Sequence, residues 1–159
     1  MPGYEQPYNN IGLLYQTLNQ NDIAIPYFKK ALEINPKYLY AYNNLALSYL
    51  NCNQPKDAIV YLKKAIKIDP KSSFSFQNLA QAYYLCKNYA QAARYYQIAL
   101  KLDSSDPTTL FKLGQTFLMM SNNKKAKDYF LAAQKRFQTR NNTPMVKKIQ
   151  SILDRLERM

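Results

Sequence analysis

The sequence repeats itself every 34 residues, and no gap is needed to align the copies. The first copy contains YNNIGLLYQTLNQNDIAIPYFKKALEINP, and the second contains YNNLALSYLNCNQPKDAIVYLKKAIKIDP. Four copies occupy residues 5–38, 39–72, 73–106 and 107–140. A period of about 20–50 residues is typical of arrays in which each unit buries its apolar face only against its neighbours. The sequence therefore predicts one stacked array spanning residues 1–159.

Bulky and aliphatic residues recur at helical spacing in the first half of each repeat. Tyr8 is followed by Ile11 and Tyr15, and the later repeats carry apolar residues at the same positions. Residues three and four apart lie on one face of an α-helix. Phe28 and Ala31 show the same spacing in the second half. Because the chain also contains only 3 Gly, we predict an all-helical protein in which each repeat is a pair of helices.

Small residues stand at matching places in both predicted helices of every repeat. They are Gly12, Ala46, Ala80 and Gly114 in the first helices, and Ala24, Ala58, Ala92 and Ala126 in the second. Small residues that face each other let two helices approach to about 8 Å. This small and aromatic signature, with the 34-residue period, resembles the tetratricopeptide repeat (TPR) family. The resemblance implies a right-handed α-solenoid of antiparallel helix pairs, with about nine helices, whose first helices line a concave groove.

Proline and capping residues predict where several helices begin and end. Asn35-Pro36 and Asp69-Pro70 should end second helices, because proline disfavours helical geometry in the residue before it. Asp106 is predicted to cap a helix that Pro107 opens. A last helix over residues 143–158 has an apolar stripe that includes Ile149 and Leu153. We interpret it as the cap that a terminal repeat needs; a partner-binding helix is the alternative.

The first-helix positions not used in packing are expected, from the resemblance, to face the groove and contact a partner. They are Asn9, Asn10, Tyr40, Asn43, Asn44, Leu47, Phe74, Gln77, Asn78, Gln81, Phe111, Lys112 and Gln115. Asn10, Asn44 and Asn78 lie one repeat apart, and an amide offers both donors and an acceptor. Such a ladder would hold the main chain of an extended peptide. Hydrogen bonds between neighbouring helices remain an alternative role for these amides.

Some family members hold a terminal carboxylate with two basic residues and asparagines spread over three first helices. Most of that pattern is replaced in this sequence, because Thr108 and Phe74 stand at matching positions where the pattern has a basic residue. A carboxylate clamp of that type is therefore not predicted.

The charge of the chain points to a second candidate surface. There are 22 Lys and Arg residues against 10 Asp and Glu residues, which gives a net charge of +12. Several lysines recur at second-helix positions that should lie on the convex side: Lys29, Lys30, Lys63, Lys64, Lys67, Lys101 and Lys135. We interpret them as a solvated surface that keeps the array soluble, with an acidic protein as the alternative partner. Nucleic acid is disfavoured, because nearly all the tyrosines occupy packing positions.

The sequence predicts neither catalysis nor a cofactor or metal site. It has no His, the commonest general base, and its acidic residues do not converge. Cys52 and Cys86 occupy equivalent positions, at which other repeats have Leu18 and Met120, so a buried apolar role is predicted. The predicted function is a protein-interaction scaffold that binds a partner peptide or protein segment. A self-assembling homo-oligomer is the alternative, because exposed repeat edges can stack.

No apolar run reaches the roughly 18–20 residues of a membrane helix, and the start MPGYEQPYNN lacks the features of a signal peptide. We therefore expect a cytoplasmic location. Because a repeat begins almost at the first residue, we also expect the chain to be a piece of a longer protein, in which case any targeting segment lies outside the sequence given.

Overall fold

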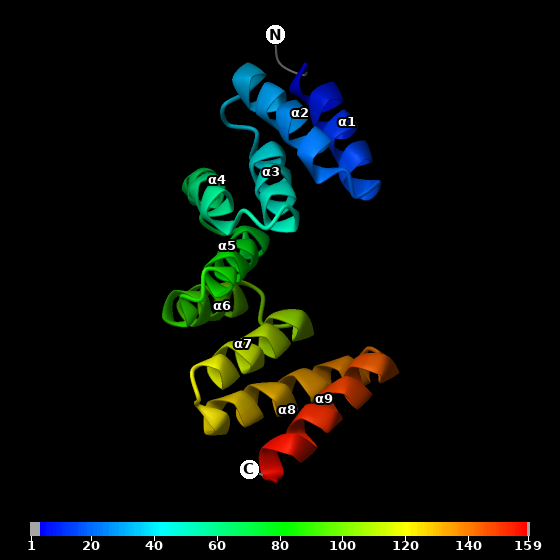
Figure 1. Ribbon diagram of the computed structural model, residues 1–159, viewed down its shortest axis with the longest axis vertical. Helices are drawn as coiled ribbons and strands as arrows, with labels where there is room; N and C mark the ends of the chain where they lie inside the picture. The colour runs from blue at the N-terminus through cyan, green and yellow to red at the C-terminus, as the bar shows by residue number, and fades with distance from the viewer. Residues whose placement is uncertain (1–3, 159) are drawn as a thin grey trace.

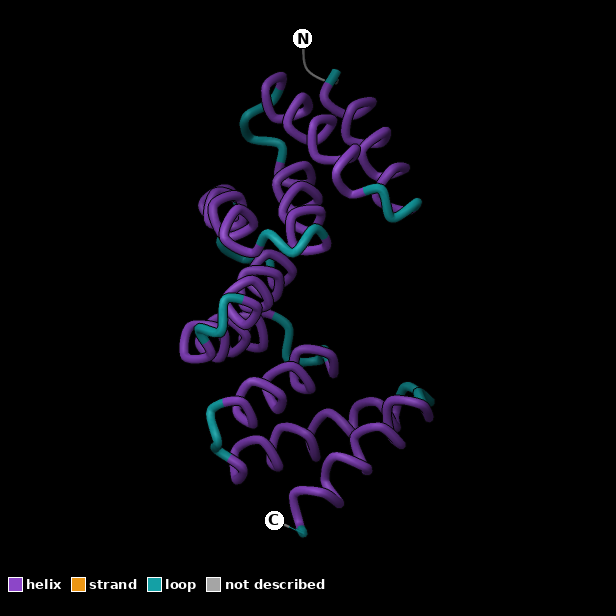
Figure 2. Tube along the Cα trace, in the orientation of Figure 1, coloured by secondary structure: helices purple, strands orange, loops and turns teal. Residues whose placement is uncertain are grey.

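The computed structural model describes residues 4–158, and all of the regular structure in this range is helical (Figure 2). Residues 1–3 and Met159, which belong to the predicted array, lie outside the described residues. The helices are α1 (Glu5–Thr17), α2 (Asn21–Ile34), α3 (Leu39–Asn51), α4 (Pro55–Ile68), α5 (Ser73–Leu85), α6 (Tyr89–Leu102), α7 (Pro107–Met119), α8 (Asn123–Thr139) and α9 (Thr143–Glu157). The prediction of an all-α protein is confirmed.

The helices form a curved stack of antiparallel pairs (Figure 1). Each odd-numbered helix from α1 to α7 packs against the even-numbered helix that follows it. The second helix of each pair also packs against the first helix of the next pair, and α9 packs against α8. Figure 1 shows α1 and α9 near opposite ends of the stack, with α4 and α6 on its outer side. This is the right-handed α-solenoid that the resemblance to the tetratricopeptide repeat family implies.

The repeated apolar positions form a core that runs through the stack. In the second helices, alanines alternate with a bulky residue: Ala24, Phe28 and Ala31 are completely buried, as are Ala126, Phe130 and Ala133. Leu45, Leu79 and Leu113 in the first helices are at most 1% exposed. Ile11 occupies the equivalent position in α1 but is 38% exposed. The difference arises because a preceding helix pair covers α3, α5 and α7, whereas no described helix precedes α1.

The capping residues act largely as the sequence predicts. The second helices α2 and α4 end at Ile34 and Ile68, directly before Asn35-Pro36 and Asp69-Pro70. The Asp106 carboxylate accepts hydrogen bonds from the backbone N–H groups of Thr108, at 3.1 Å, and of Thr109, at 2.9 Å. Pro107 opens α7, which confirms this helix start. The Asp106 cap thus stabilises the start of α7.

The turn inside each helix pair uses a residue in the left-handed backbone region. These residues are Asn19 (φ 59°), Asn53 (φ 56°), Lys87 (φ 60°) and Ser121 (φ 57°), spaced one repeat apart. Each follows the C-cap of a first helix, where such a conformation satisfies the last carbonyl groups. Asparagine tolerates this region better than lysine does. The α5–α6 turn therefore carries backbone strain that the α1–α2 turn largely avoids.

Lys87→Gly should raise the free energy of unfolding by about 0.5–1 kcal/mol, because glycine escapes the steric cost of a positive φ but loses more chain entropy. Urea unfolding followed by circular dichroism measures this change. Lys63→Gly, at an exposed position inside α4, is the matched control and should lower stability by about 1 kcal/mol. Equal destabilisation by both changes would argue against strain at Lys87.

Candidate functional site

A pocket of ≈ 390 Å³ opens between the first helices α3, α5 and α7. It is lined by Leu47, Leu50, Asn51, Gln77, Asn78, Gln81, Leu85, Tyr96, Thr108, Thr109 and Lys112. Leu47 and the polar residues Gln77, Asn78, Gln81 and Lys112 are among the predicted groove positions. The structure thus brings five of the thirteen predicted residues together around one hollow.

The three asparagines of the predicted ladder have different surroundings. Asn10 is exposed. The Asn44 amide group donates from Nδ2 to Asn9 Oδ1 at 3.0 Å, which ties α3 to α1. The Nδ2 atom of Asn78 is buried, and it has no hydrogen-bond partner in the structure. Asn44 therefore serves helix packing, whereas Asn78 keeps an unused donor at the pocket.

Gln81 joins two side chains across the pocket. Its Oε1 atom accepts a hydrogen bond from the Tyr96 hydroxyl at 3.0 Å and another from Lys112 Nζ at 2.6 Å. Burial raises the pKa of Tyr96, so its hydroxyl remains a donor at neutral pH. Burial, and secondly the charge of Lys148, lower the pKa of Lys112. The ammonium group of Lys112 thus lies in a partly desolvated place beside another cation.

Lys112 has no carboxylate partner in the part of the chain that the structure describes. Between residues 4 and 158, the ion pairs within 4.0 Å are Lys30–Glu33 and Lys127–Glu157. An ammonium group has three N–H donors, and one of those of Lys112 is directed to Gln81. The remaining donors of Lys112 are therefore open to a ligand with acceptor atoms, and the unpaired Nδ2 of Asn78 reaches the same pocket if its amide group turns toward it.

Exposed aromatic side chains stand on two of the first helices that line this pocket. The exposed fraction is 67% for Tyr40, on α3, and 48% for Phe74, on α5. Gln115 lines a smaller hollow next to Gln81 and Lys112. Gln77 lines the pocket but donates from Nε2 to Asp106 Oδ2 at 2.9 Å, so it also supports the α7 cap. The groove thus combines amide donors, one ammonium group and exposed rings.

Three predicted groove residues are buried, which corrects the expectation that they are open to a partner. Asn9 is 4% exposed and accepts the hydrogen bond from Asn44. Asn43 is 7% exposed, and its Oδ1 accepts from the Ser75 hydroxyl at 2.9 Å. Phe111 is 6% exposed; its ring centroid lies 5.6 Å from that of Phe130, and Lys148 of α9 lies over it. These side chains hold neighbouring helices together.

Several pocket residues were not predicted from the sequence. Asn51 and Leu85 stand four residues after Leu47 and Gln81, and Thr108 stands four residues before Lys112. Side chains four apart lie on one face of a helix. Adding the residue four positions before or after a predicted groove residue on the same helix would have identified these positions. Tyr96 gives no such signal, because its position matches the buried Phe28, Leu62 and Phe130.

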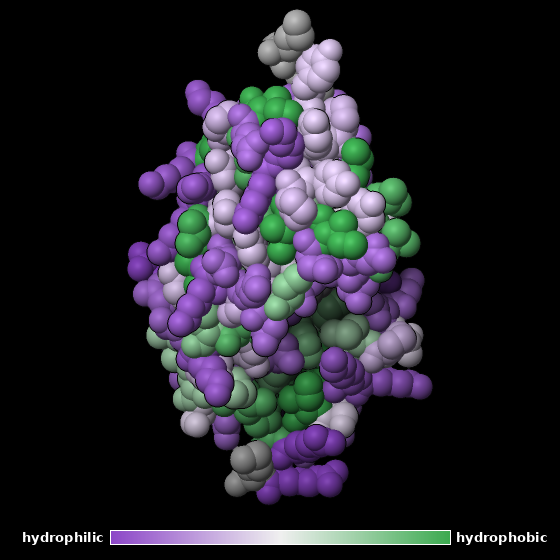
Figure 3. Space-filling view, turned by 45° about the horizontal axis from the view of Figure 1, so that its top comes forward, coloured by the Kyte–Doolittle hydropathy of each residue, from purple (hydrophilic) through white to green (hydrophobic). Residues whose placement is uncertain are grey.

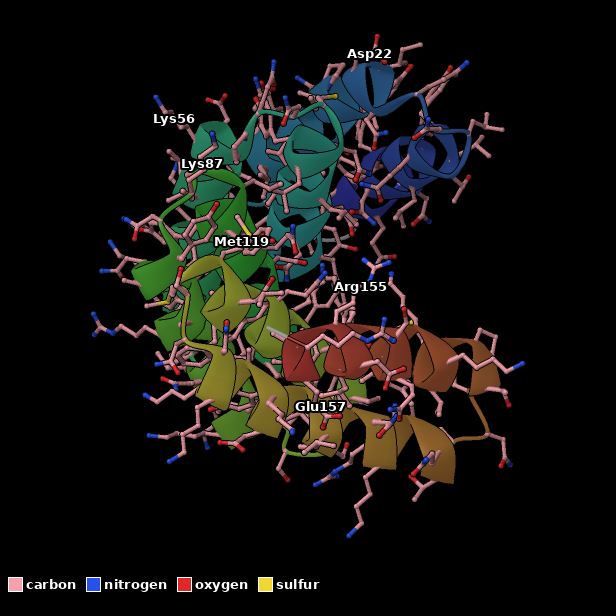
Figure 4. All side chains as sticks on the ribbon, turned by 60° about the horizontal axis from the view of Figure 1, so that its bottom comes forward. Asp22, Lys56, Lys87, Met119, Arg155 and Glu157 are labelled. Atoms are coloured by element: carbon pink, nitrogen blue, oxygen red, sulfur yellow. The ribbon has the colours of Figure 1, made fainter. Side chains whose placement is uncertain are left out.

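The recurring lysines lie on the second helices and are exposed (Lys29, Lys30, Lys63, Lys64, Lys67, Lys101 and Lys135). Some cover aromatic rings: Lys29 Nζ lies 5.7 Å from the centre of the Tyr49 ring, and Lys64 Nζ lies 5.5 Å from that of Tyr61. Figure 4 shows two further lysines, Lys56 and Lys87, at one edge of the stack. The basic surface is thus separate from the pocket, although Lys112 and Lys148 add positive charge near it.

Both cysteines have free thiols and are half-buried at the C-caps of α3 and α5. Burial, and secondly the charge of Asp22, raise the pKa of the Cys52 thiol, which disfavours the reactive thiolate. Across residues 4–158, no three His, Cys, Asp or Glu side chains gather closely enough to hold a metal ion. Over the same range, no helix combines the length and apolar composition that crossing a membrane requires.

Solved structures with the same fold include three of MamA. A crystal structure of MamA protein has a TM-score of 0.78 and 22% identity, over 99% of this chain and 88% of that chain. Another crystal structure of MamA has a TM-score of 0.74 and 22% identity, over 93% and 95%. MamA 41-end from Desulfovibrio magneticus RS-1 has a TM-score of 0.81 and 20% identity, over 85% and 76%. At these identities, the likeness shows a shared fold.

Models of the tetratricopeptide repeat match most of the sequence. They cover residues 6–38, 39–72 and 61–94. A further model described as TPR repeat covers residues 80–121. No curated protein sequence matches the chain. Because the matched segments run without interruption from residue 6 to residue 121 and the helix pairs stack as the repeat requires, the chain belongs to the tetratricopeptide repeat family.

Proposed function

We propose that the chain is a non-enzymatic interaction scaffold whose concave groove binds an extended segment of a partner protein. The family and the solenoid fold support a protein-interaction role in general. The observation that carries the groove proposal is the buried Asn78 Nδ2 without a partner, on an amide that lines the pocket. Leaving a buried donor unpaired costs about 1–3 kcal/mol. When the amide group of Asn78 turns toward the pocket, its Nδ2 donates to a ligand carbonyl, which removes this cost and favours binding there.

Lys112 adds a preference for an acidic residue in the bound segment. Its ammonium group shares the pocket with Asn78 and has no carboxylate partner among the described residues. A carboxylate from the ligand forms a charge-assisted hydrogen bond, which is about twice as strong as a neutral one. It also offsets the charge of Lys148 beside Lys112. The proposed ligand therefore places a main-chain carbonyl at Asn78 and an Asp or Glu side chain at Lys112.

The exposed rings of Tyr40 and Phe74 complete the proposed contact. They lie one repeat apart on α3 and α5, the helices that flank the pocket. Aromatic side chains on an exposed surface provide a large apolar contact area for a partner. Apolar ligand residues on the side of the acidic one that faces α5 and α3 fit this arrangement. The amide and ammonium groups then fix the register, and the rings add contact area.

Peptides selected on the chain from a random library, and then measured by fluorescence anisotropy, test this proposal. Asn78→Ala and Lys112→Met should each weaken the selected acidic peptides about 10–100-fold, because each removes a hydrogen bond to the ligand. Asn78 alone is changed, because Asn44 already donates to Asn9 and its loss would disturb the contact between α1 and α3. Lys67→Met, on the exposed side of α4, is the matched charge control.

The control decides between the groove and the basic second-helix surface. Binding that falls with Lys112→Met but not with Lys67→Met supports the groove. If both lysine variants weaken the peptides equally, and salt abolishes binding to the parent, general charge attraction explains the interaction. Unchanged affinity in both Asn78→Ala and Lys112→Met removes the pocket from the proposal.

A further inference from the structure

The outer face of α1 carries an apolar stripe that no described helix covers. Tyr4, Pro7, Ile11, Leu14 and Leu18 follow one another at intervals of three and four residues, so they lie on one side of the helix. The exposed fractions are 61% for Tyr4, 38% for Ile11, 58% for Leu14 and 59% for Leu18. Alternating intervals of three and four are the spacing by which two helices pack along a shared seam.

The equivalent positions in the other repeats are fully covered. The residues that match Pro7, Ile11 and Leu14 are Ala41, Leu45 and Ser48 in α3, Ser75, Leu79 and Ala82 in α5, and Thr109, Leu113 and Thr116 in α7. All nine are at most 2% exposed. The preceding second helix packs against each of these first helices: α2 on α3, α4 on α5 and α6 on α7. The stripe on α1 is thus the stacking face of a repeat, which no helix between residues 4 and 158 covers.

The side chains on this face differ from those of an internal stacking face. Leu14 stands where the other repeats have a small residue: Ser48, Ala82 or Thr116. Pro7 likewise stands where they have Ala41, Ser75 or Thr109. Small residues at these two positions let the preceding helix approach closely. Leu14 and Pro7 hold a covering helix further away. The face is therefore shaped for a seam of large apolar side chains rather than for one more repeat in the same packing.

The charge distribution favours a second copy of the chain as the covering partner. Although the net charge is +12, the sequence contains no Lys or Arg before Lys29. Two copies can thus bring their α1 faces together without placing ammonium groups against each other. At the opposite end of the stack, α9 exposes Lys147, Lys148 and Arg155. Stacking α9 of one copy on α1 of the next would put the charges of these three residues on the apolar stripe, which costs desolvation. Figure 3 shows green and near-white side chains around the N-terminal end.

We propose that two copies of this chain associate through their α1 helices across a two-fold axis, and that the interface buries Ile11, Leu14 and Leu18 of each copy. A two-fold interface uses the same patch twice, which suits a single uncharged stripe. Because α1 has 13 residues, it is about 20 Å long. An interface of this length lies at the small end of specific contacts, so the dimer dissociates at concentrations on the order of micromolar. This inference does not depend on the groove.

Sedimentation velocity of the chain between about 1 and 100 µM tests the dimer, since this range brackets the micromolar dissociation constant. The parent should shift from monomer to dimer as its concentration rises. Leu14→Lys should remain monomeric throughout, because it places two ammonium groups in the seam. Leu131→Lys adds the same charge at another exposed leucine, on α8, and should dimerise like the parent.

A milder variant separates the interface from any effect on folding. Leu14→Ala introduces the residue found at Ala82, so it keeps α1 helical and should weaken the dimer about 10-fold or more, in line with the loss of large buried side chains. Circular dichroism verifies the helix content of each variant. A parent that stays monomeric up to the highest concentration overturns the proposal. So does a Leu14→Lys dimer, or an equal loss of dimer in Leu131→Lys.

Discussion

Changing Ile149 and Leu153 to alanine together should lower the stability of the C-terminal end by about 4–8 kcal/mol, because each large-to-small change in a core costs about 2–5 kcal/mol. Both side chains are on α9, at 0% and 3% exposure. They belong to the same buried cluster as Phe111 and Phe137. Without them, α9 loses its hold on α8, and the apolar face of the last repeat becomes accessible to water.

Hydrogen exchange measured along the chain is the suitable readout, because a repeat array need not unfold as one unit. Protection should fall in α7, α8 and α9 and persist in α1 to α4. Lys147→Ala changes an exposed residue of α9 and should alter stability by less than about 0.5 kcal/mol. A double variant with undiminished protection at this end would show that α9 does not act as a cap.

The regular part of the fold was predictable because the repeats constrain one another. Positions such as Ala24, Phe28 and Ala31 recur in four copies, so each copy supports the interpretation of the others. Ile11 shows where this reasoning fails. It shares the pattern of the buried Leu45, yet it is 38% exposed, because a pattern in one helix does not reveal whether another helix covers it. Burial at the end of an array depends on a neighbour outside the repeat.

The groove was predicted only in part, because the side of a helix that faces open space depends on its neighbours. Asn78, Gln81 and Lys112 do meet at one pocket. Phe111 was expected to face the groove, but it packs against Phe130 and lies beneath Lys148 of α9. Asn44 and Asn78 are identical in type and position within the repeat, yet only Asn44 finds Asn9 as a partner. Sequence alone does not distinguish these two asparagines.

The combined size of two residues that face each other between the helices of a repeat is also constrained. In the first and last repeats, a glycine faces a buried phenylalanine: a Cβ atom on Gly12 would lie 2.6 Å from the Phe28 ring, and one on Gly114 would lie 2.7 Å from the Phe130 ring. In the second repeat, Ala46 and Leu62 stand at the same two positions. In these three repeats the helices thus keep their close approach by exchanging bulk between the two sides. The third repeat departs from this exchange, because Ala80 and the buried Tyr96 stand at these positions.

Gly114→Ala should lower the free energy of unfolding by about 1–3 kcal/mol, although alanine is the better helix former. Helix propensity alone predicts a gain of about 1 kcal/mol at this position inside α7. The added methyl group, however, meets Cδ1 and Cε1 of Phe130 at 2.7 Å. Phe130 is completely buried, so its ring cannot move aside without displacing other core residues. Chemical unfolding followed by circular dichroism measures the difference.

The sign of this effect should reverse when Phe130 is replaced by leucine. Phe130→Leu alone should cost about 1–1.5 kcal/mol, because a similar but smaller side chain fills the site. In that background, Gly114→Ala recreates the Ala46–Leu62 pair of the second repeat, so the clash disappears and the helix-forming advantage of alanine remains. The two changes should therefore be strongly non-additive, as contacting residues are. If alanine at Gly114 is equally destabilising in both backgrounds, the close approach of α7 and α8 does not depend on the Phe130 ring.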